Sequence, residues 1–318
     1  MTEAMHYKAA FERVKKLVMP DVLAKAEKEK KATGKDKTRW TRMANRWWQF
    51  RDYQPGTMRA IASIPRYIAC SRSAKRPTFD FVSSDVHPDG KVVVFPFPDD
   101  YSFGILQSSA HWEWTKSRGG TQTARFTYTS ETVFDTFAWP QFEISEGRVP
   151  RVPNLKKYEV QKSGTRGTRP SDAIEKIRAV ADAARALRNL RREIMAANGW
   201  SLRELYKSLE TPGENRLRTA HAALDAAVRT AYGMKPDEDI LAFLLKLNLE
   251  LADKEAKGEV ITPPGLPAFV PEPESFVSRD CVRSPDDPEA DGSTAKSAAE
   301  AAHFYITGKE EGPPYRVK

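Results

Sequence analysis

The stretch PRYIACSRSAKRPTFDFVSS, residues 65–84, decides the fold of this chain. It contains RYIAC and TFDFVS, two short runs of β-branched and aromatic residues separated by a basic turn. After the turn signal HPDGK, a third run of the same kind, VVVFPF, ends at residue 97. Runs of this length and composition between turn signals predict three strands of a small sheet.

The residues after these runs predict one helix and one further strand. FGILQSSAHWEWTKSR, residues 103–118, has apolar residues at helical spacing, and the pair Gly119-Gly120 ends it. TARFTYT, residues 123–129, then alternates as a strand does, and we expect Phe134, Phe137 and Trp139 to anchor the sheet.

The chain becomes helical after a basic linker. Apolar periodicity predicts helices over residues 171–198, 201–209, 215–232 and 239–257, and Ser201 with Glu204 has the spacing of a capping box. Short connections between them favour an antiparallel arrangement. The predicted fold class is α+β: a small mixed or antiparallel sheet with a packed helix, an antiparallel helical subdomain and a disordered tail.

These patterns divide the chain into five parts. We expect a basic helical segment over 1–60, a recognition domain over 61–150, a linker over 151–170, a helical domain over 171–258 and a mostly disordered tail over 259–318. The tail is rich in proline and acidic residues and poor in apolar ones, which is the reason to expect disorder.

The charge is distributed unevenly along the chain. Residues 1–60 contain 15 Lys and Arg against 7 Asp and Glu, whereas residues 259–318 contain 6 against 11. A basic front of this kind indicates a polyanionic partner, and double-stranded DNA is the simplest one, although anionic lipid and a merely solvated helix face give the same count.

Composition also sets the expected compartment. The chain has two cysteines, Cys70 and Cys281, and has no run of about 18 apolar residues, so we expect a cytoplasmic protein with no membrane segment.

One basic segment interleaves arginine with tryptophan. In TRWTRMANRWWQFRDY, residues 38–53, Arg42 and Arg46 alternate with aromatic residues as in a groove that binds a phosphate backbone. The alternative is that Trp47 and Trp48 only cap a neighbouring core, and both interpretations can hold together.

Two further places have the residue types that bind DNA. Strand alternation over residues 121–127 would put Thr121, Thr123, Arg125 and Thr127 on one face, with Phe126 and Tyr128 on the other. The turn after the first strand adds the basic residues Arg72, Lys75 and Arg76. A solvated hairpin tip has the same composition, so this alternative stays open.

The residues needed for catalysis do not occur in a recognisable pattern. A glycine-rich loop between a strand and a helix is absent from the sequence, and the five histidines lack the spacing of metal ligands. We therefore predict no catalytic residue, no metal site and no cofactor bound by this chain.

A family resemblance covers these segments. PRYIACSRSAKRPTFDFVSS, DDYSFGILQSSAHWEW and RFTYTSETVFDTFAWPQ resemble the target-recognition domain of MmeI-like, type IIL or IIG, adenine-specific DNA methyltransferases, including those of phage-defence systems. The stretches NGWSLRELY, TPGENRLR and LDAAVRTAYGM are similar to the C-terminal domain that follows it. Where the family has Phe-Pro-Trp-Pro, this chain has Phe137-Ala138-Trp139-Pro140.

The resemblance implies a role in DNA methylation. Such proteins transfer a methyl group from S-adenosylmethionine to adenine N6 in an upstream catalytic domain, whose glycine-rich loop and Asn-Pro-Pro-Tyr-type motif do not occur here. It also implies that Thr123, Arg125 and Thr127 read the target site in double-stranded DNA. This chain is then a specificity part that works with a catalytic methyltransferase subunit or domain. The alternatives are an inactive gene fragment and a protein-binding scaffold.

Overall fold

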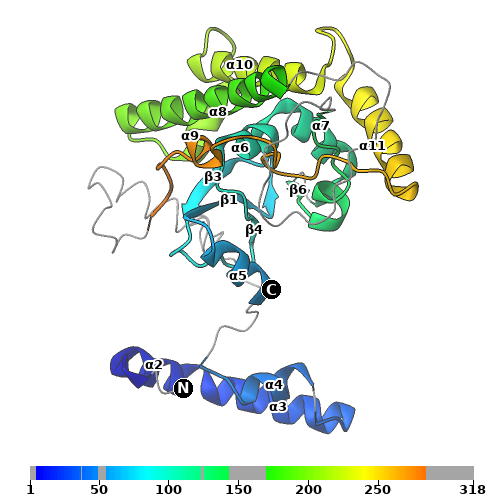
Figure 1. The fold of residues 1–318 in the computed structure, drawn as a ribbon. Helices are drawn as coiled ribbons and strands as arrows, with labels where there is room; N and C mark the ends of the chain where they lie inside the picture. Colours follow the sequence, from blue (N-terminus) through cyan, green and yellow to red (C-terminus); the bar gives the residue numbers. More distant parts are fainter. Residues whose placement is uncertain (1–4, 37, 49–54, 123–124, 143–169, 284–318) are drawn as a thin grey trace. The chain divides into compact units, whose positions relative to one another are not determined.

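The computed structural model describes residues 5–36, 38–48, 55–122, 125–142 and 170–283. The chain divides into two compact units, residues 1–59 and residues 60–318, each of which is considered by itself. All of the strands found in the described residues belong to the second unit (Figure 1). Helices and antiparallel strands together confirm the predicted α+β class.

The first unit is a short helical assembly with a very small apolar interior. It contains α2 (Lys8–Leu17), α3 (Met19–Thr33) and α4 (Arg39–Ala44). Helix α2 ends before Pro20, and the proline lies in the first turn of α3, where its missing N–H costs nothing. Among the described residues of this unit, the buried apolar side chains are Val22, Ala26 and Met43.

A three-stranded antiparallel sheet forms the centre of the second unit. Helix α5 (Pro55–Ala62) leads into β1 (Arg66–Ser71), which lies between β3 (Phe79–Ser83) and β4 (Val92–Phe95). All three strands fall in the runs that the sequence predicts. Ile68 in the central strand is opposite Phe81 on one side and Phe95 on the other.

The segment predicted as one helix over 103–118 is two helices. α6 (Asp100–Gln107) and α7 (Ser109–Arg118) are separated by Ser108, which has an extended backbone. The Ser108 hydroxyl accepts a hydrogen bond from the backbone N–H of His111 and so caps the second helix. The apolar spacing continues across this serine, which is why periodicity alone does not reveal the break.

The C-terminal helices follow the sequence closely. They are α8 (Pro170–Asn198), α9 (Leu202–Lys207), α10 (Arg216–Tyr232) and α11 (Ile240–Ala256), with a 3₁₀ turn η2 (Ser208–Glu210) after α9. The predicted capping box is confirmed: Ser201 accepts from the N–H of Glu204, and the Glu204 carboxylate accepts from the N–H of Ser201 (2.7 Å).

One hydrophobic core joins the sheet to these helices. α8 packs against α6 and against α10, as Figure 1 also shows. Ile68, Phe103, Leu187 and Leu224 belong to the same buried cluster. The recognition and helical segments, which the sequence separates by a linker, therefore share one core in the described residues.

The expected disorder after residue 258 is wrong for residues 259–283, which we call the strap. This segment includes the 3₁₀ turn η3 (Pro273–Phe276), and Val270 and Phe276 are buried in the core. Val282 pairs with Val82 at the edge of β3. Its prolines remove backbone donors and lower its chain entropy, which lets a segment poor in regular structure remain ordered. Residues 284–318 lie outside the described part.

Buried charges hold the end of the strap in place. The carboxylate of Asp100, which is 0% exposed, accepts hydrogen bonds from Arg66 (2.8 Å), Arg188 (2.5 Å) and Arg185 (2.8 Å). Asp280 in the strap accepts from Arg188 (2.8 Å), and Ser278 donates to Asp100 (2.9 Å). The network thus links the strap to β1, α6 and α8.

The same network fixes the ionisation of the strap carboxylate. Burial by itself would raise the pKa of Asp280, but the hydrogen bond and charge of Arg188 outweigh burial and lower it. Asp280 therefore remains charged, and its charge balances the buried guanidinium groups.

Gly104 sets the distance between α6 and α8, so we expect Gly104→Ala to lower the free energy of unfolding by about 1–3 kcal/mol. A Cβ atom at this position would lie 2.7 Å from Cγ1 of Val180 and 3.2 Å from Cβ of Ala184. Gly90→Ala is the control, because a Cβ there meets nothing within 4 Å. Urea unfolding of both variants checks the prediction, and equal stabilities would refute it.

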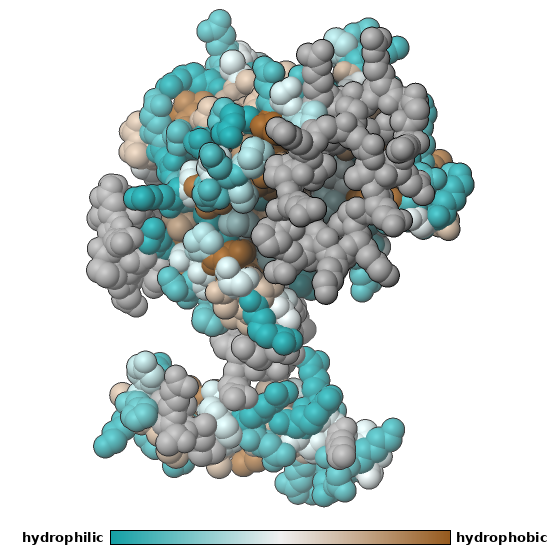
Figure 2. Space-filling view, in the orientation of Figure 1, coloured by the Kyte–Doolittle hydropathy of each residue, from teal (hydrophilic) through white to brown (hydrophobic). Residues whose placement is uncertain are grey.

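The surface of the described residues is largely polar. On the face drawn in Figure 2, hydrophilic residues predominate and the hydrophobic ones form small separate spots. Within the described ranges, the helices are all too short or too polar to cross a membrane.

Candidate nucleic-acid interface

A second, smaller sheet brings the two predicted DNA-binding segments together. It consists of β2 (Ser73–Ala74), β6 (Arg125–Thr127) and β5 (Gly120–Gln122), in the order β2-β6-β5. We call it the small sheet. The basic turn after β1 supplies β2, which pairs with β6 through Ser73 opposite Thr127 and Ala74 opposite Phe126. The backbone N–H of Tyr128 extends this pairing by donating to the carbonyl of Arg72 (2.8 Å).

Three exposed cations lie on the small sheet or directly beside it. Arg72 precedes β2, Lys75 follows it, and Arg125 begins β6. None of the three side chains forms an ion pair with another residue in the described part of the chain. The pairing of Ala74 with Phe126 brings the end of β2, after which Lys75 follows, next to β6, which begins at Arg125.

The two faces of β6 have the chemistry that alternation predicts. Tyr128, just after the strand, is 2% exposed, Phe126 is half-buried, and Arg125 is exposed. The polar positions of this strand therefore face away from the core, while the aromatic positions pack toward it.

The predicted continuous strand over 121–127 is wrong, because these residues form a hairpin. β5 ends at Gln122, β6 begins at Arg125, and the two strands are antiparallel. Thr121 is opposite Phe126, and directly opposite residues belong to the same face of a sheet. The position of Thr121 is therefore on the face of Phe126 and not on the face of Arg125 and Thr127. Thr123, which the resemblance also assigns to base reading, lies outside the described residues. Alternation counted across an unrecognised turn gives the wrong phase.

Arg76 differs from the other two cations of its turn. It is half-buried, and its guanidinium carbon lies 5.9 Å from the centroid of the Trp112 ring on α7. It forms no hydrogen bond or ion pair within the described part of the chain, so its donors are available to a ligand.

Two cations that the sequence analysis missed lie close to the hairpin. Lys116 and Arg118 are exposed in the last turn of α7, which ends immediately before β5. Lys116 pairs with Glu113 (2.7 Å), and Arg118 stacks on Trp114 (4.9 Å). Their position directly before Gly119-Gly120 was the available signal, because a helix that ends at a hairpin delivers its last side chains to that hairpin.

A buried histidine, His111, forms a hydrogen bond with Tyr128, the residue that follows β6. Nδ1 of His111 donates to the carbonyl of Leu106 (2.8 Å), which leaves Nε2 to accept from the hydroxyl of Tyr128 (2.9 Å). Burial lowers the pKa of His111 to about 4, so the ring is neutral at physiological pH. His111 is therefore a structural residue.

A second buried histidine makes stability depend on pH. Burial, together with the charges of Arg191 and Arg76, lowers the pKa of His221 to about 3. Both histidines have a usual pKa near 6.5, so below pH 6.5 the unfolded chain binds protons that the folded chain excludes. Burial raises the pKa of Asp99 to about 6, so near pH 5 the folded chain binds a proton on Asp99 that the unfolded chain does not bind. This proton cancels about one of the two that the histidines of the unfolded chain take up.

We therefore expect the free energy of unfolding to fall by about 1.4 kcal/mol per pH unit between pH 6 and pH 5. Chemical unfolding across this range measures the slope. The variant His111→Gln/His221→Gln should lose the decrease, and a slope that this variant leaves unchanged would contradict the assignment.

The remaining predicted DNA-binding residues belong to the first unit. Arg42 lies on α4 and Arg46 follows it, and both side chains are exposed. Trp47 is half-buried against Phe11 (5.4 Å between ring centroids) and Trp48 (5.7 Å). Within this unit, the tryptophan rings pack together and the two arginine side chains are exposed, and binding of a phosphate backbone by this segment stays a prediction.

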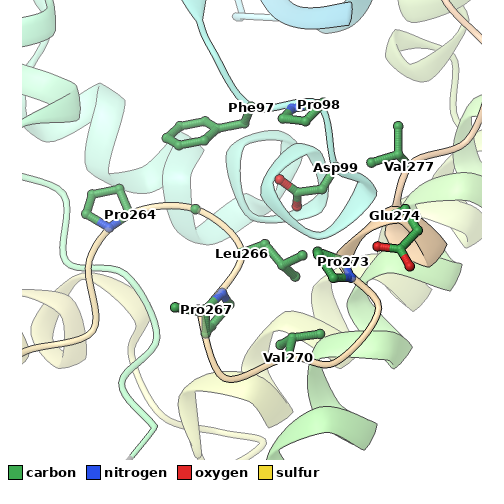
Figure 3. Close-up of a pocket in the computed structure, with 12 residues that line it drawn as sticks. Phe97, Pro98, Asp99, Pro264, Leu266, Pro267, Val270, Pro273, Glu274 and Val277 are labelled. Atoms are coloured by element: carbon green, nitrogen blue, oxygen red, sulfur yellow. The ribbon is translucent and has the colours of Figure 1, made fainter. Parts of the chain in front are cut away.

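The strap closes over a cavity of about 490 Å³ (Figure 3). Phe97, Pro98 and Asp99 line one side, and strap residues, many of them prolines, line the other. Both oxygens of the Asp99 carboxylate already accept hydrogen bonds from Ser102 (2.7 and 2.9 Å). The lining of this cavity is mostly apolar and includes no glycine-rich loop at a helix N-terminus.

Comparisons with known proteins cover the part of the chain that contains the small sheet. Residues 10–141 match the family model of the MmeI target recognition domain. DNA methyltransferase A of Bacillus subtilis (strain 168) is 25% identical over 210 residues, which are 65% of this chain and 20% of that protein.

A solved structure gives a further similarity. The type IIL restriction-modification enzyme MmeI in complex with DNA is 22% identical, with a TM-score of 0.47, over 73% of this chain and 26% of that chain. The chain thus spans about a fifth to a quarter of the length of these proteins. The matched residues include all three strands of the small sheet, and residues 10–141 of this chain are an MmeI-like target recognition domain.

Proposed function

We propose that this chain binds double-stranded DNA and selects the target site of a restriction-modification methyltransferase. The observation that carries the proposal is the set of exposed cations on the small sheet, Arg72, Lys75 and Arg125, which have no ion-pair partner among the described residues. Unpaired arginine and lysine next to hydroxyl side chains suit phosphate oxygens and guanine edges. The match to a target recognition domain and the name of the Bacillus relative support DNA as the polyanion.

The chemistry of the complete enzyme is a finer part of the proposal. We infer that the chain works with a catalytic methyltransferase subunit or domain, which supplies S-adenosylmethionine and transfers its methyl group to adenine N6. We propose that the residues of this chain hold and orient DNA without binding that cofactor or taking part in methyl transfer. Defence against phage is the biological setting that we propose for such an enzyme.

Selection of DNA from a pool of randomised duplexes tests the recognition function. The full chain at low salt should enrich one sequence motif. Arg125→Ala should relax the selection at one or two positions, because loss of a paired contact from arginine to guanine removes about 1–3 kcal/mol of discrimination. Lys207→Ala, on α9, is the matched control and should keep the motif.

The alternatives predict other outcomes. A protein-binding scaffold would enrich no motif, and Arg125→Ala would then change nothing. Incubation of the chain with S-adenosylmethionine and DNA should transfer no methyl group, whereas a self-sufficient enzyme would methylate the DNA. A gene fragment without function would bind DNA neither selectively nor with salt dependence.

A further inference from the structure

Trp112 lies where three elements of the candidate interface meet. It is a half-buried residue in the middle of α7, outside both segments that were assigned to DNA binding. Its ring contacts Phe126 edge to face, with 5.0 Å between centroids and an interplanar angle of 81°. The guanidinium carbon of Arg76 lies 5.9 Å and the ammonium of Lys116 lies 5.7 Å from the ring centroid.

These contacts restrict the side-chain conformations of Arg76 and Lys116 in the free protein. Arg76 forms no hydrogen bond or ion pair within the described part of the chain, although its charge also acts on His221 and Asp225, and its contact with the Trp112 ring restricts its orientation. Lys116 also pairs with Glu113 (2.7 Å) and depends on the ring less. A long side chain that is already ordered loses less rotamer freedom when it binds a phosphate, and this gain appears as affinity.

The contact with Phe126 acts on the hairpin itself. Phe126 lies between Arg125 and Thr127 in β6 and faces α7. An aromatic pair of this geometry contributes about 0.5–1.5 kcal/mol beyond its buried area. Trp112 therefore restrains the strand whose opposite face presents Arg125.

Trp114, two residues further along α7, packs in the hydrophobic core. It is fully buried, and its indole N–H donates to the hydroxyl of Thr136 (3.1 Å). Trp112 is only half-buried, and its contacts include two cations and the hairpin. The two tryptophans thus have different neighbours: Trp112 contacts Arg76, Lys116 and Phe126, whereas Trp114 packs in the core and contacts Arg118.

We propose that Trp112 is a positioning residue for DNA binding, which orients Arg76 and restrains the β5–β6 hairpin. This inference rests on the proposed function. It adds to the interface a residue that does not contact DNA itself but positions side chains that do.

Duplex binding by the full chain tests the proposal, with fluorescence anisotropy on a 30-base-pair duplex of fixed sequence as the readout. Trp112→Leu should weaken binding about tenfold and reduce the slope of log K against log salt by about 0.9, the share of one phosphate contact. Trp112→Phe keeps a ring at the site and should restore most of the affinity and slope. Trp200→Leu, which removes a half-buried tryptophan in the connection before α9, is the control for stability.

A purely structural role would lower the melting temperature of Trp112→Leu and leave the salt slope unchanged, and that result would overturn the proposal. If the wild-type chain does not bind duplex DNA, the proposed function fails, and amide hydrogen exchange in the free protein then decides. Exchange of the Arg125–Thr127 amides should rise in Trp112→Leu and stay at the wild-type level in Trp112→Phe. Equal exchange in all three proteins would also overturn the proposal.

Discussion

Asp100→Asn will lower the free energy of unfolding by about 3–5 kcal/mol, because it removes the more deeply buried of the two carboxylates that balance the charges of Arg66 and Arg188. Arg66 and Arg188 are 2% exposed, and Asp100 is 0% exposed. Asparagine has nearly the same shape, so the loss reflects charge more than volume. Urea unfolding followed by circular dichroism measures it.

Asp182→Asn is the matched control for this variant. Asp182 also pairs with Arg185 (3.6 Å), but its side chain is 60% exposed, and exposed ion pairs contribute about 0–1 kcal/mol. Asp100→Asn should also increase amide exchange in the strap, since Ser278 and Asp280 lose their link to α6. If both variants are as stable as the wild type, the network does not hold the strap.

The triple variant Arg72→Ala/Lys75→Ala/Arg125→Ala will bind duplex DNA at least about 100-fold more weakly at low salt. Each cation that neutralises one phosphate contributes about 0.9 to the salt slope, so the slope should fall by about 2.7. The three side chains are exposed, and we expect a change of less than about 0.5 kcal/mol each in the free energy of unfolding. Anisotropy titrations between 50 and 200 mM salt give both quantities.

Lys207→Ala/Lys235→Ala/Lys246→Ala removes the same charge from the helical region and is the control for net charge. These three lysines are exposed on α9, after α10 and on α11. This variant should lose much less affinity than the first one. Equal losses would mean that DNA binding follows total charge and does not involve the small sheet.

Most elements of the fold could be predicted from local patterns. The three central strands and the helices from α8 to α11 have turn signals, capping residues and apolar periodicity that act within a few residues. The break at Ser108 was missed because the apolar spacing continues across it. The pairing of β5 with β6 was missed because residues 121–127 were counted as one strand.

The order of the strap could not be predicted, because its causes are distant in sequence. Asp280 lies in a segment of the sequence that is rich in proline and acidic residues. Its charge is balanced by Arg188, which lies on α8. Local composition therefore indicates disorder, while the long-range ion pairs and the burial of Phe276 determine the outcome.

The candidate site was predicted in part. The sequence identified the basic turn and Arg125 separately, and the pairing of β2 with β6 brings them together. Trp112 was not identified, because a helical spacing gives no indication of which face adjoins a small sheet, whereas Lys116 and Arg118 were overlooked although they lie directly before Gly119-Gly120. Whether any of these residues touches DNA stays a prediction.

Photochemical cross-linking of duplex DNA to the full chain, followed by mapping of the modified peptides, tests the central claim most directly. The account predicts cross-links within residues 71–76 and 116–128, with loss of these cross-links in the triple variant. Cross-links confined to peptides outside these two segments, at a yield that the triple variant leaves unchanged, would contradict it.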